Sequence, residues 1–263
     1  MAVKGIDVSH HQGTINWNTV KAELLRINEN KNPGFAILRI GYSATHGRGG
    51  LVMDNQFLRN LAECERLGIP VGVYWYCYDR SAEAARITAQ QVVKMLSGHK
   101  YQYPIYYDVE YEAFNRAAGK AVNTALIVAA LDVLEKAGYY AAVYCSRNFF
   151  LQYTNLSQLS NFDKWEAAYT ATDTNTIQNG LWQCSSTNAW GIKGFGNKLD
   201  CDLSYRDYPT IIRNAGLNGY TKPGIDDAVW ATDGPWTIEK ATGQDKQALR
   251  ELCESKQLKV TMA

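Results

Sequence analysis

The chain has 263 residues, enough for one large α/β barrel or for a domain of about 200 residues with a small appendage. Its 27 basic and 26 acidic residues leave a formal net charge of +1, so charge gives no reason to expect a nucleic-acid partner or an anionic membrane surface. No stretch approaches about 18 continuous apolar residues, and we therefore expect no membrane insertion.

The N-terminus and the cysteines point to no export signal and no metal chemistry. The opening MAVKGIDVSHHQG lacks a charged leader followed by about 7–15 apolar residues, so we expect no secretory signal peptide. The six cysteines are scattered without a C-x-x-C pair, which predicts reduced thiols used in packing. His10 and His11 share one turn, but His46 and His99 fall in predicted loops, so we expect no metal or other cofactor.

The first half of the chain alternates predicted strands and helices. The predicted strands are residues 5–9, 35–42, 71–78, 103–110 and 141–146. One predicted helix begins after Asn16, and three others span residues 54–67 (approximately), 82–96 and 120–136. The strands are nearly continuous in apolar residues, which indicates a parallel sheet with helical crossovers.

This rhythm changes in the last third of the chain. Residues 164–170, 181–186 and 199–205 are short predicted strands joined by loops, and a final helix covers about 208–215. Eight strands with helices mainly between the early ones predict an α/β fold, a closed and deformed (β/α) barrel. An open doubly wound sheet is the alternative, but the sequence lacks a G-x-G-x-x-G fingerprint.

Composition also divides the chain into domains. We assign residues 1–216 to the barrel and the polar, turn-rich residues 217–226 to a linker. Residues 227–263 have a strand–helix–strand pattern and form a small C-terminal β-α-β module. Fewer than about 40 residues rarely fold alone, so we expect this module to dock on the barrel or to pair with a copy of itself.

The strand that ends in YYDVE carries the most informative acids. Side chains alternate along a strand, so Asp108 and Glu110 are predicted on one face with their Cβ atoms roughly 6.5–7 Å apart. Two carboxylates at that range can hold different pKa values and divide acid and base roles. The alternative is a strand that simply ends in solvent, where acids are common.

Further acids are predicted at the same end of the barrel. Asp7 lies at the end of the first strand, and Asp200 and Asp202 lie on the last one. First and last strands are neighbours in a closed barrel, and reactive residues gather at the C-terminal ends of barrel strands. A cluster of acids with one protonated carboxyl suits cleavage of a glycosidic bond.

Aromatic residues near strand ends are candidates for a sugar-binding groove, although core packing is an equally good explanation for any one of them. The candidates are Tyr42, Tyr74, Tyr76, Tyr106, Tyr144, Trp165 and Trp182. Arg39 is a lone charge inside a predicted strand. It either pairs with the acid cluster or the substrate, or forms a plain buried ion pair.

Six motifs occur in a characteristic order, namely GIDVSHHQGTINW, ILRIGY, GIPVGVYWY, YPIYYDVE, WQCSS and DCDLS. Residues 5 to about 208 thereby resemble the glycoside hydrolase family 25 muramidases, the Chalaropsis-type lysozymes. The resemblance implies a deformed β/α barrel and metal-free hydrolysis of the β-1,4 bond between N-acetylmuramic acid and N-acetylglucosamine in peptidoglycan.

The resemblance also implies roles for the acids. Glu110 is the expected general acid, and Asp108 is expected to stabilise the intermediate or to orient the substrate's acetamido group. Asp7 and Asp202 are expected to be supporting catalytic residues, and Asp200 could replace Asp202. Many family members have Y-H-F where this chain has Tyr74-Trp75-Tyr76, so no role is assigned to Trp75.

The resemblance implies that the partner is a peptidoglycan glycan strand. A phage or prophage endolysin, made in the bacterial cytoplasm and acting on the wall after release, is the expected setting; an autolysin with a trimmed leader is the alternative. Two other functions remain open: a catalytically silent peptidoglycan-binding barrel, and a chitinase-like glycosidase, whose D-x-x-D-x-D-x-E strand is absent. The C-terminal module is predicted to bind the wall or to self-associate as a homo-oligomer.

Overall fold

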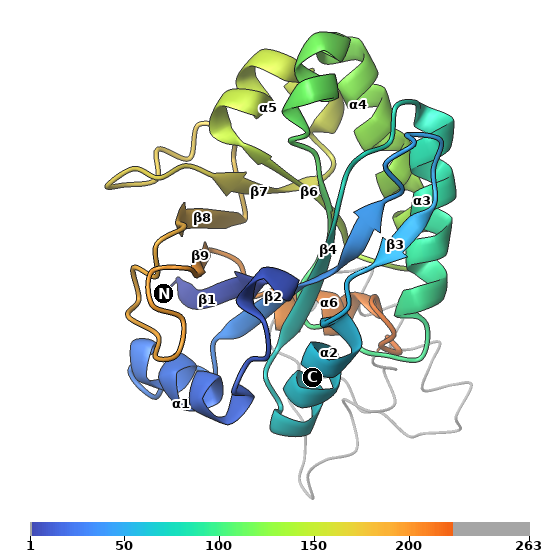
Figure 1. Ribbon diagram of the computed structural model, residues 1–263. Helices are drawn as coiled ribbons and strands as arrows, with labels where there is room; N and C mark the ends of the chain where they lie inside the picture. The colour runs from blue at the N-terminus through green and yellow to red at the C-terminus, as the bar shows by residue number, and fades with distance from the viewer. Residues whose placement is uncertain (1, 223–263) are drawn as a thin grey trace, which may run out of the picture. The chain divides into compact units, whose positions relative to one another are not determined.

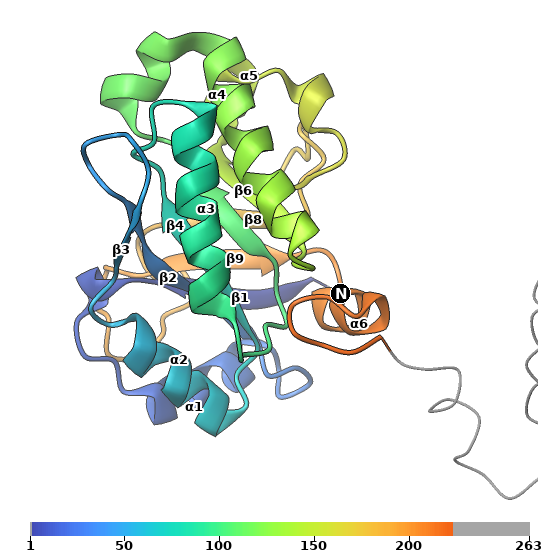
Figure 2. The same cartoon turned by 90° about the vertical axis from the view of Figure 1, so that its right-hand side faces the viewer.

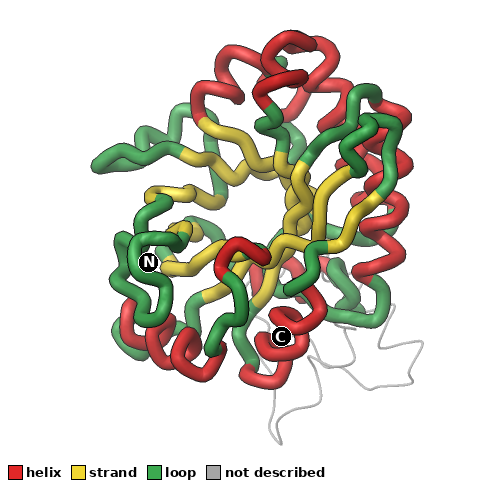
Figure 3. The backbone as a smooth tube through the Cα atoms, in the orientation of Figure 1, coloured by secondary structure: helices red, strands yellow, loops and turns green. Residues whose placement is uncertain are grey.

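The fold is a closed barrel of eight strands with a ninth strand outside the ring (Figures 1 and 3). The computed structural model describes residues 2–222. The strands are β1 Val3–Val8, β2 Phe35–Ser43, β3 Leu51–Met53, β4 Val71–Tyr76, β5 Ile105–Asp108, β6 Ala141–Ser146, β7 Asp163–Ala167, β8 Leu181–Ser185 and β9 Asp200–Ser204. The ring runs β1-β9-β8-β7-β6-β5-β4-β2, and pairing of β1 with β2 closes it. The predicted eight-stranded deformed barrel is confirmed; β3, which pairs with the end of β2, was not predicted.

Helices cover only part of the ring. They are α1 Trp17–Ile27, α2 Phe57–Leu67, α3 Ala82–Leu96, α4 Glu112–Lys136, α5 Arg147–Tyr153 and α6 Tyr208–Ala215. In Figures 1 and 2, α3 and α4 lie side by side, whereas long loops flank β7, β8 and β9. The predicted loss of helices late in the chain is therefore confirmed, although the short helix α5 was missed.

Strand direction changes where the barrel closes. The strands β1, β2 and β4 to β8 form parallel pairs, but β9 is antiparallel to both of its neighbours, β8 and β1. No helix lies between β8 and β9, and a strand that returns without a crossover runs in the opposite direction. As a result, the start of β9 lies beside the end of β1.

Local signals place the helix ends at or near the predicted positions (α2 begins at Phe57 rather than at about residue 54), with one exception. The Asn16 side chain accepts a hydrogen bond from Thr19 N at 3.2 Å, and that of Ser81 accepts one from Ala84 N at 3.1 Å. These side chains satisfy amide groups that a helix start leaves free. The exception is α4, which begins at Glu112 rather than at residue 120 and is broken at Gly119, where φ is 79°.

Apolar side chains form two layers, one inside the ring and one between the ring and the helices. Along β5 the layers alternate: Tyr106 belongs to the inner cluster, and Ile105 and Tyr107 belong to the outer one. This alternation continues past the strand, because Val109 is also in the outer cluster. Asp108 therefore shares the inner face with Tyr106, and the barrel itself aims this acid inward.

Within residues 2–222, α4 is the one helix long and apolar enough to cross a membrane. Its most apolar window is 44% buried, and the helix packs on α3, α5 and β6. A core helix that covers a barrel has the same composition as a membrane span. The predicted absence of membrane insertion stays a prediction.

Residues 217–220 pack at the floor of the barrel, the end where the parallel strands begin. Asn218 is fully buried and accepts a hydrogen bond from Tyr140 N at 2.7 Å. Its side-chain amide donates to the carbonyl oxygens of Tyr101 and Tyr103 at 3.2 and 2.9 Å. The first residues of the predicted linker are thus packed on the barrel; the rest of that linker and the 227–263 module lie outside the described residues.

Candidate active site

The acids predicted from sequence meet at the mouth, the end of the barrel where the parallel strands finish. Asp7 is the penultimate residue of β1 and pairs in register with Asp200 on β9. Asp108 is the last residue of β5, and Glu110 lies two residues further on. The carboxyl groups of Asp7 and Asp202 are within hydrogen-bond reach of each other.

Glu110 is partly exposed, as is Asp200 on β9. The amide of Val109 donates to Tyr144 O at 3.0 Å, which carries the β5–β6 pairing one residue past the strand and holds Glu110 at the rim. Burial, followed by the negative charges of Asp200 and Glu112, raises the pKa of Glu110 to about 7. A carboxyl with such a pKa is substantially protonated near neutral pH, as a proton donor must be.

Asp108 lies deeper, with only 4% of its surface exposed. Burial and the neighbouring Glu110 raise its pKa well above the ordinary value, and the charge of Arg39 opposes this shift. Its Oδ1 atom is buried without a hydrogen-bond donor among residues 2–222. A buried acceptor of this kind is costly in a folded protein, so it is a candidate to receive a donor from a ligand.

Asp7 and Asp202 are held by neutral donors rather than by cations. Gln183 Nε2 donates to Asp7 Oδ2 at 2.8 Å, and Trp165 Nε1 donates to Asp202 Oδ1 at 2.8 Å. Burial and the nearby acids on β9 raise the pKa of both carboxyls well above the ordinary value. The competing candidate Asp200 is more exposed, and burial raises its pKa to about 6.

The aromatic candidates fall into two groups. Tyr42, Tyr74 and Tyr76 are half-buried, and the rings of Tyr42 and Tyr76 contact Tyr78 at centroid distances of 6.0 and 5.0 Å. The buried candidates are Tyr106, Tyr144, Trp165 and Trp182. Full burial favours core packing for Tyr106 and Trp165, whereas the first group remains available to a ligand.

Arg39 forms the buried ion pair that was one of its two predicted alternatives. Its Nε atom lies 2.8 Å from Asp54 Oδ2, and the same oxygen accepts a hydrogen bond from His10 N at 3.1 Å. Arg39 follows Phe35 and Ile37 on the inner face of β2, so its charge also acts on the mouth. Asp54 was missed, although a lone charge inside a strand signals that a partner must exist.

Sequence reasoning also missed Gln183 and Tyr169. Gln183 was seen only as part of the WQCSS motif, and nothing in its residue type distinguishes it from a structural glutamine. Tyr169 lies just after β7, is 59% exposed, and donates its hydroxyl to Gln183 Oε1 at 2.9 Å. These two residues connect the rim of the barrel to Asp7.

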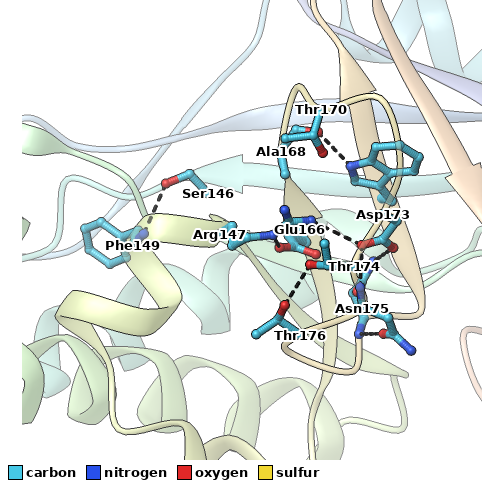
Figure 4. A network of polar contacts seen from close by, with 12 residues as sticks. Ser146, Arg147, Phe149, Glu166, Ala168, Thr170, Asp173, Thr174, Asn175 and Thr176 are labelled. Carbon is cyan, nitrogen blue, oxygen red and sulfur yellow. Dashed lines mark hydrogen bonds and ion pairs between the residues drawn. The ribbon is translucent and has the colours of Figure 1, made fainter.

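The loop that carries Tyr169, residues 168–180, is anchored by a polar network (Figure 4). Arg147 forms an ion pair with the buried Glu166 and a second one with Asp173 at 3.2 Å. At the loop's start, Trp182 Nε1 donates to Ala168 O at 2.8 Å. The network ties this wall of the mouth to the start of α5, because Arg147 is the first residue of that helix.

A hollow of about 1010 Å³ opens at the floor rather than at the mouth. It is lined by residues near the starts of strands, among them Val3, Gly34, Val71 and Tyr103. The acids of the mouth do not border it. We place the candidate site at the mouth because the unusual carboxyl groups are there, and a site is argued from its chemistry rather than from volume.

Comparison with known proteins identifies the family of this chain. The sequence signature described as glycosyl hydrolases family 25 matches residues 6–192. This chain belongs to that family. The resemblance inferred from the six motifs is thereby confirmed. No curated protein matches the chain.

Solved structures of other family 25-like barrels match as well. The modular autolysin LytC from Streptococcus pneumoniae is 30% identical, with a TM-score of 0.62; the match covers 78% of this family 25 chain and 47% of LytC. The lysozyme from Streptomyces coelicolor is 17% identical, with a TM-score of 0.63 and coverage of 82% and 97%. The spore cortex lytic enzyme SleM of Clostridium perfringens is 22% identical, with a TM-score of 0.63 and coverage of 77% and 67%. The chain thus spans about half the length of LytC, and the two less similar proteins show the shared fold.

Proposed function

We propose that this family 25 chain hydrolyses the β-1,4 bond between N-acetylmuramic acid and N-acetylglucosamine in bacterial peptidoglycan. The observation that carries the proposal is the pair at the mouth: a partly exposed Glu110 with a pKa of about 7 beside the buried Asp108. Family membership and the similarity to LytC, whose structure holds a synthetic peptidoglycan ligand, support the choice of substrate.

Glu110 acts as the general acid in this proposal. Its proton goes to the glycosidic oxygen as the bond to the departing sugar breaks, and positive charge builds up on the remaining sugar ring. At pH values below about 7 the side chain carries the proton it must give. After the departing sugar has left, the Glu110 carboxylate can take a proton from the water that completes hydrolysis.

Asp108 stabilises the positive charge of the intermediate. The expected Cβ separation of roughly 6.5–7 Å fits neither a retaining pair of carboxyl groups, which lie roughly 5–5.5 Å apart, nor a firm inverting pair, because the side chains can rotate. A route in which the substrate's own acetamido group attacks makes no demand on that distance. We therefore propose that the substrate's acetamido oxygen attacks the sugar carbon while Asp108 accepts a hydrogen bond from the acetamido N–H. The free Oδ1 atom of Asp108 suits that contact. A trapped glycosyl-Asp108 adduct from a slow fluorinated substrate would contradict this route.

The other predicted residues take supporting roles. Asp7 and Asp202 tune the charge of the mouth, and half-buried Tyr42, Tyr74 and Tyr76 offer ring faces and hydroxyls to the sugars. Arg39 holds its charge near Asp108 through its ion pair with Asp54. Trp182 supports the wall of the mouth through its bond to Ala168.

A turbidity assay on purified cell walls tests the proposal. The wild-type chain should clear the suspension, and Glu110→Gln should bind the walls without clearing them. If neither protein clears walls but both bind, the chain is a silent binding barrel. Mass spectrometry of the released fragments should show N-acetylmuramic acid at the new reducing ends; cleavage of chitin oligomers instead would indicate a chitinase-like enzyme.

We further propose that the chain acts at the cell wall as an endolysin or autolysin does, with glycan strands as its partner. Self-association through residues 227–263 stays a prediction. Light scattering on the full chain and on a chain ending at residue 222 tests it, and that end point retains the Asn218 contacts at the floor. If both the full chain and the shortened chain are monomeric, self-association is ruled out.

A further inference from the structure

The contact between Asp7 and Asp202 is unusual because two acids face each other in a buried place. Asp7 is 4% exposed and Asp202 is fully buried, and their carboxyl groups lie within hydrogen-bond reach. Two ionised carboxylates at that separation repel strongly where water is excluded. One proton between them converts the repulsion into a hydrogen bond.

Gln183 fixes the orientation of the Asp7 side of this contact. The side-chain oxygen of Gln183 accepts hydrogen bonds from the hydroxyls of Tyr144 and Tyr169, both at 2.9 Å. With its one oxygen occupied by two donors, the amide can only present N–H to Asp7, and it does so at Oδ2, 2.8 Å away. Asp7 Oδ2 must therefore be an acceptor, and any proton on Asp7 is on the other oxygen.

Trp165 does the same for Asp202. An indole N–H is a donor only, and it is bonded to Asp202 Oδ1 at 2.8 Å. The remaining oxygen, Oδ2, is buried and receives no donor from the described part of the chain. A proton on the facing oxygen of Asp7 would supply that missing donor.

We propose that Asp7 and Asp202 share a single proton, and that Gln183 and Trp165 are positioning residues that turn one free oxygen of each acid toward the other. The pair then carries one negative charge instead of two. Its role in the reaction rests on the proposed function, because a less negative mouth limits the charge that surrounds Glu110. The shared proton itself does not depend on which substrate is cleaved.

Other titratable groups lie near Asp7 on several elements of the barrel. Asp200 and Asp202 do so from β9, Tyr74 from β4, Tyr144 from β6, and Tyr169 from the loop after β7. The tyrosines remain neutral at ordinary pH, so Asp200 is the other group whose ionisation changes the field at the pair. Asp200 is therefore the matched control.

Carboxyl-carbon NMR on the full chain, with aspartate labelled at the side-chain carboxyl, tests the shared proton. At pH 7 we expect the Asp7–Asp202 pair to give one protonated signal, which disappears in Asp7→Asn and persists in Asp200→Asn. In Asp202→Asn, the remaining Asp7 should titrate at lower pH because the facing charge is gone. The proposal is overturned if both Asp7 and Asp202 are ionised at pH 5.

Gln183→Met tests the positioning role, since methionine has similar volume and no N–H. The lost donor stabilises the ionised form of the pair, so proton affinity should rise about tenfold, one pH unit in the titration. We also expect a roughly tenfold lower kcat with KM within about twofold. Gln158→Met, at an exposed position, controls for the substitution itself and should change neither quantity.

A purely structural role of Gln183 would lower the melting temperature and leave the titration unchanged, and that result overturns the positioning role. The NMR readout needs no substrate. If the wild-type chain fails to release fragments from cell walls while the titration shows the shared proton, the proposed function fails and this inference stands.

Discussion

The two ends of the barrel treat buried acids in opposite ways. At the floor, Asp163 accepts hydrogen bonds from the hydroxyls of Tyr208 and Tyr140 at 2.8 and 3.2 Å, and Arg206 Nε lies 3.3 Å away. At the mouth, Asp108 keeps one buried oxygen, Oδ1, without a hydrogen-bond donor from residues 2–222. Asp163 at the floor is thus fully hydrogen-bonded, whereas Asp108 at the mouth is not.

This difference indicates that the polar contacts at the floor stabilise the fold, whereas those at the mouth leave a carboxyl group free to react. A fully hydrogen-bonded buried acid contributes to folding, whereas a buried carboxyl with few partners costs folding free energy. Such a cost persists in a fold when the group is needed for another purpose. Barrels divide these tasks between their ends, with reactive residues at the C-terminal ends of the strands.

The largest expected effect is the loss of activity in Glu110→Gln. Removal of a general acid lowers kcat by about 10²–10⁴-fold, and glutamine keeps the size of the side chain. Because burial opposes ionisation of Glu110, the urea midpoint at pH 7.5 should not fall. A variant that loses activity only because it unfolds would break the comparison between the two ends.

Asp163→Ala is the opposite test, at the floor. It leaves the buried hydroxyl of Tyr208 and the half-buried hydroxyl of Tyr140 without their acceptor, so the free energy of unfolding should fall by roughly 2–4 kcal/mol. The kcat on cell walls should stay within about twofold of wild type. Tyr140→Phe removes one of these bonds and should give a smaller loss in urea denaturation.

The pH dependence of stability sharpens the comparison further. The pKa of Glu110 is raised in the folded chain to about 7, so the folded state binds this proton more tightly than the unfolded state does. The stability that this group contributes is therefore fully present below about pH 4.5 and is lost as the pH rises to about 7, a change on the order of 3 kcal/mol in the free energy of unfolding. Glu110→Gln should lack this part of the slope in urea titrations, and an unchanged slope would contradict the raised pKa.

The smallest expected effect is in Asp200→Asn. The charge of Asp200 raises the pKa of Glu110, second only to burial, so its removal should move the alkaline limb of kcat/KM to lower pH. Activity above pH 7 should fall a few-fold, and activity near pH 5 should hardly change. An unshifted alkaline limb would mean that Asp200 does not influence the acid.

Local patterns in the sequence predicted much of the fold because they depend on near neighbours. Strand and helix periodicity, and caps such as Asn16 and Ser81, follow from the geometry of each element. The same locality explains the misses. The reversed direction of β9 and the hairpin strand β3 depend on which distant strand each one meets.

For the candidate site, the sequence likewise predicted some of the residues and missed others. Residue type and spacing singled out Asp7, Asp108, Glu110 and Asp202, because acids on apolar strands are conspicuous. Gln183 and Tyr169 are ordinary residues in sequence, and their importance comes only from the atoms they meet. A lone arginine inside a strand, Arg39, indicated that an acidic partner exists. The partner, Asp54, lies 15 positions away, and no local sequence pattern connects the two residues.

By itself, the sequence determined that this chain forms a barrel, which residues face inward, and which acids stand at the strand ends, since side-chain alternation and apolar burial act over a few residues. Only the tertiary structure decided which carboxyls touch, which donors hold them, and how far burial raises their pKa values. Those contacts and pKa values depend on atoms that the fold brings together across the ring. Asp7 and Gln183, for example, are hydrogen-bonded although 176 positions separate them in the sequence.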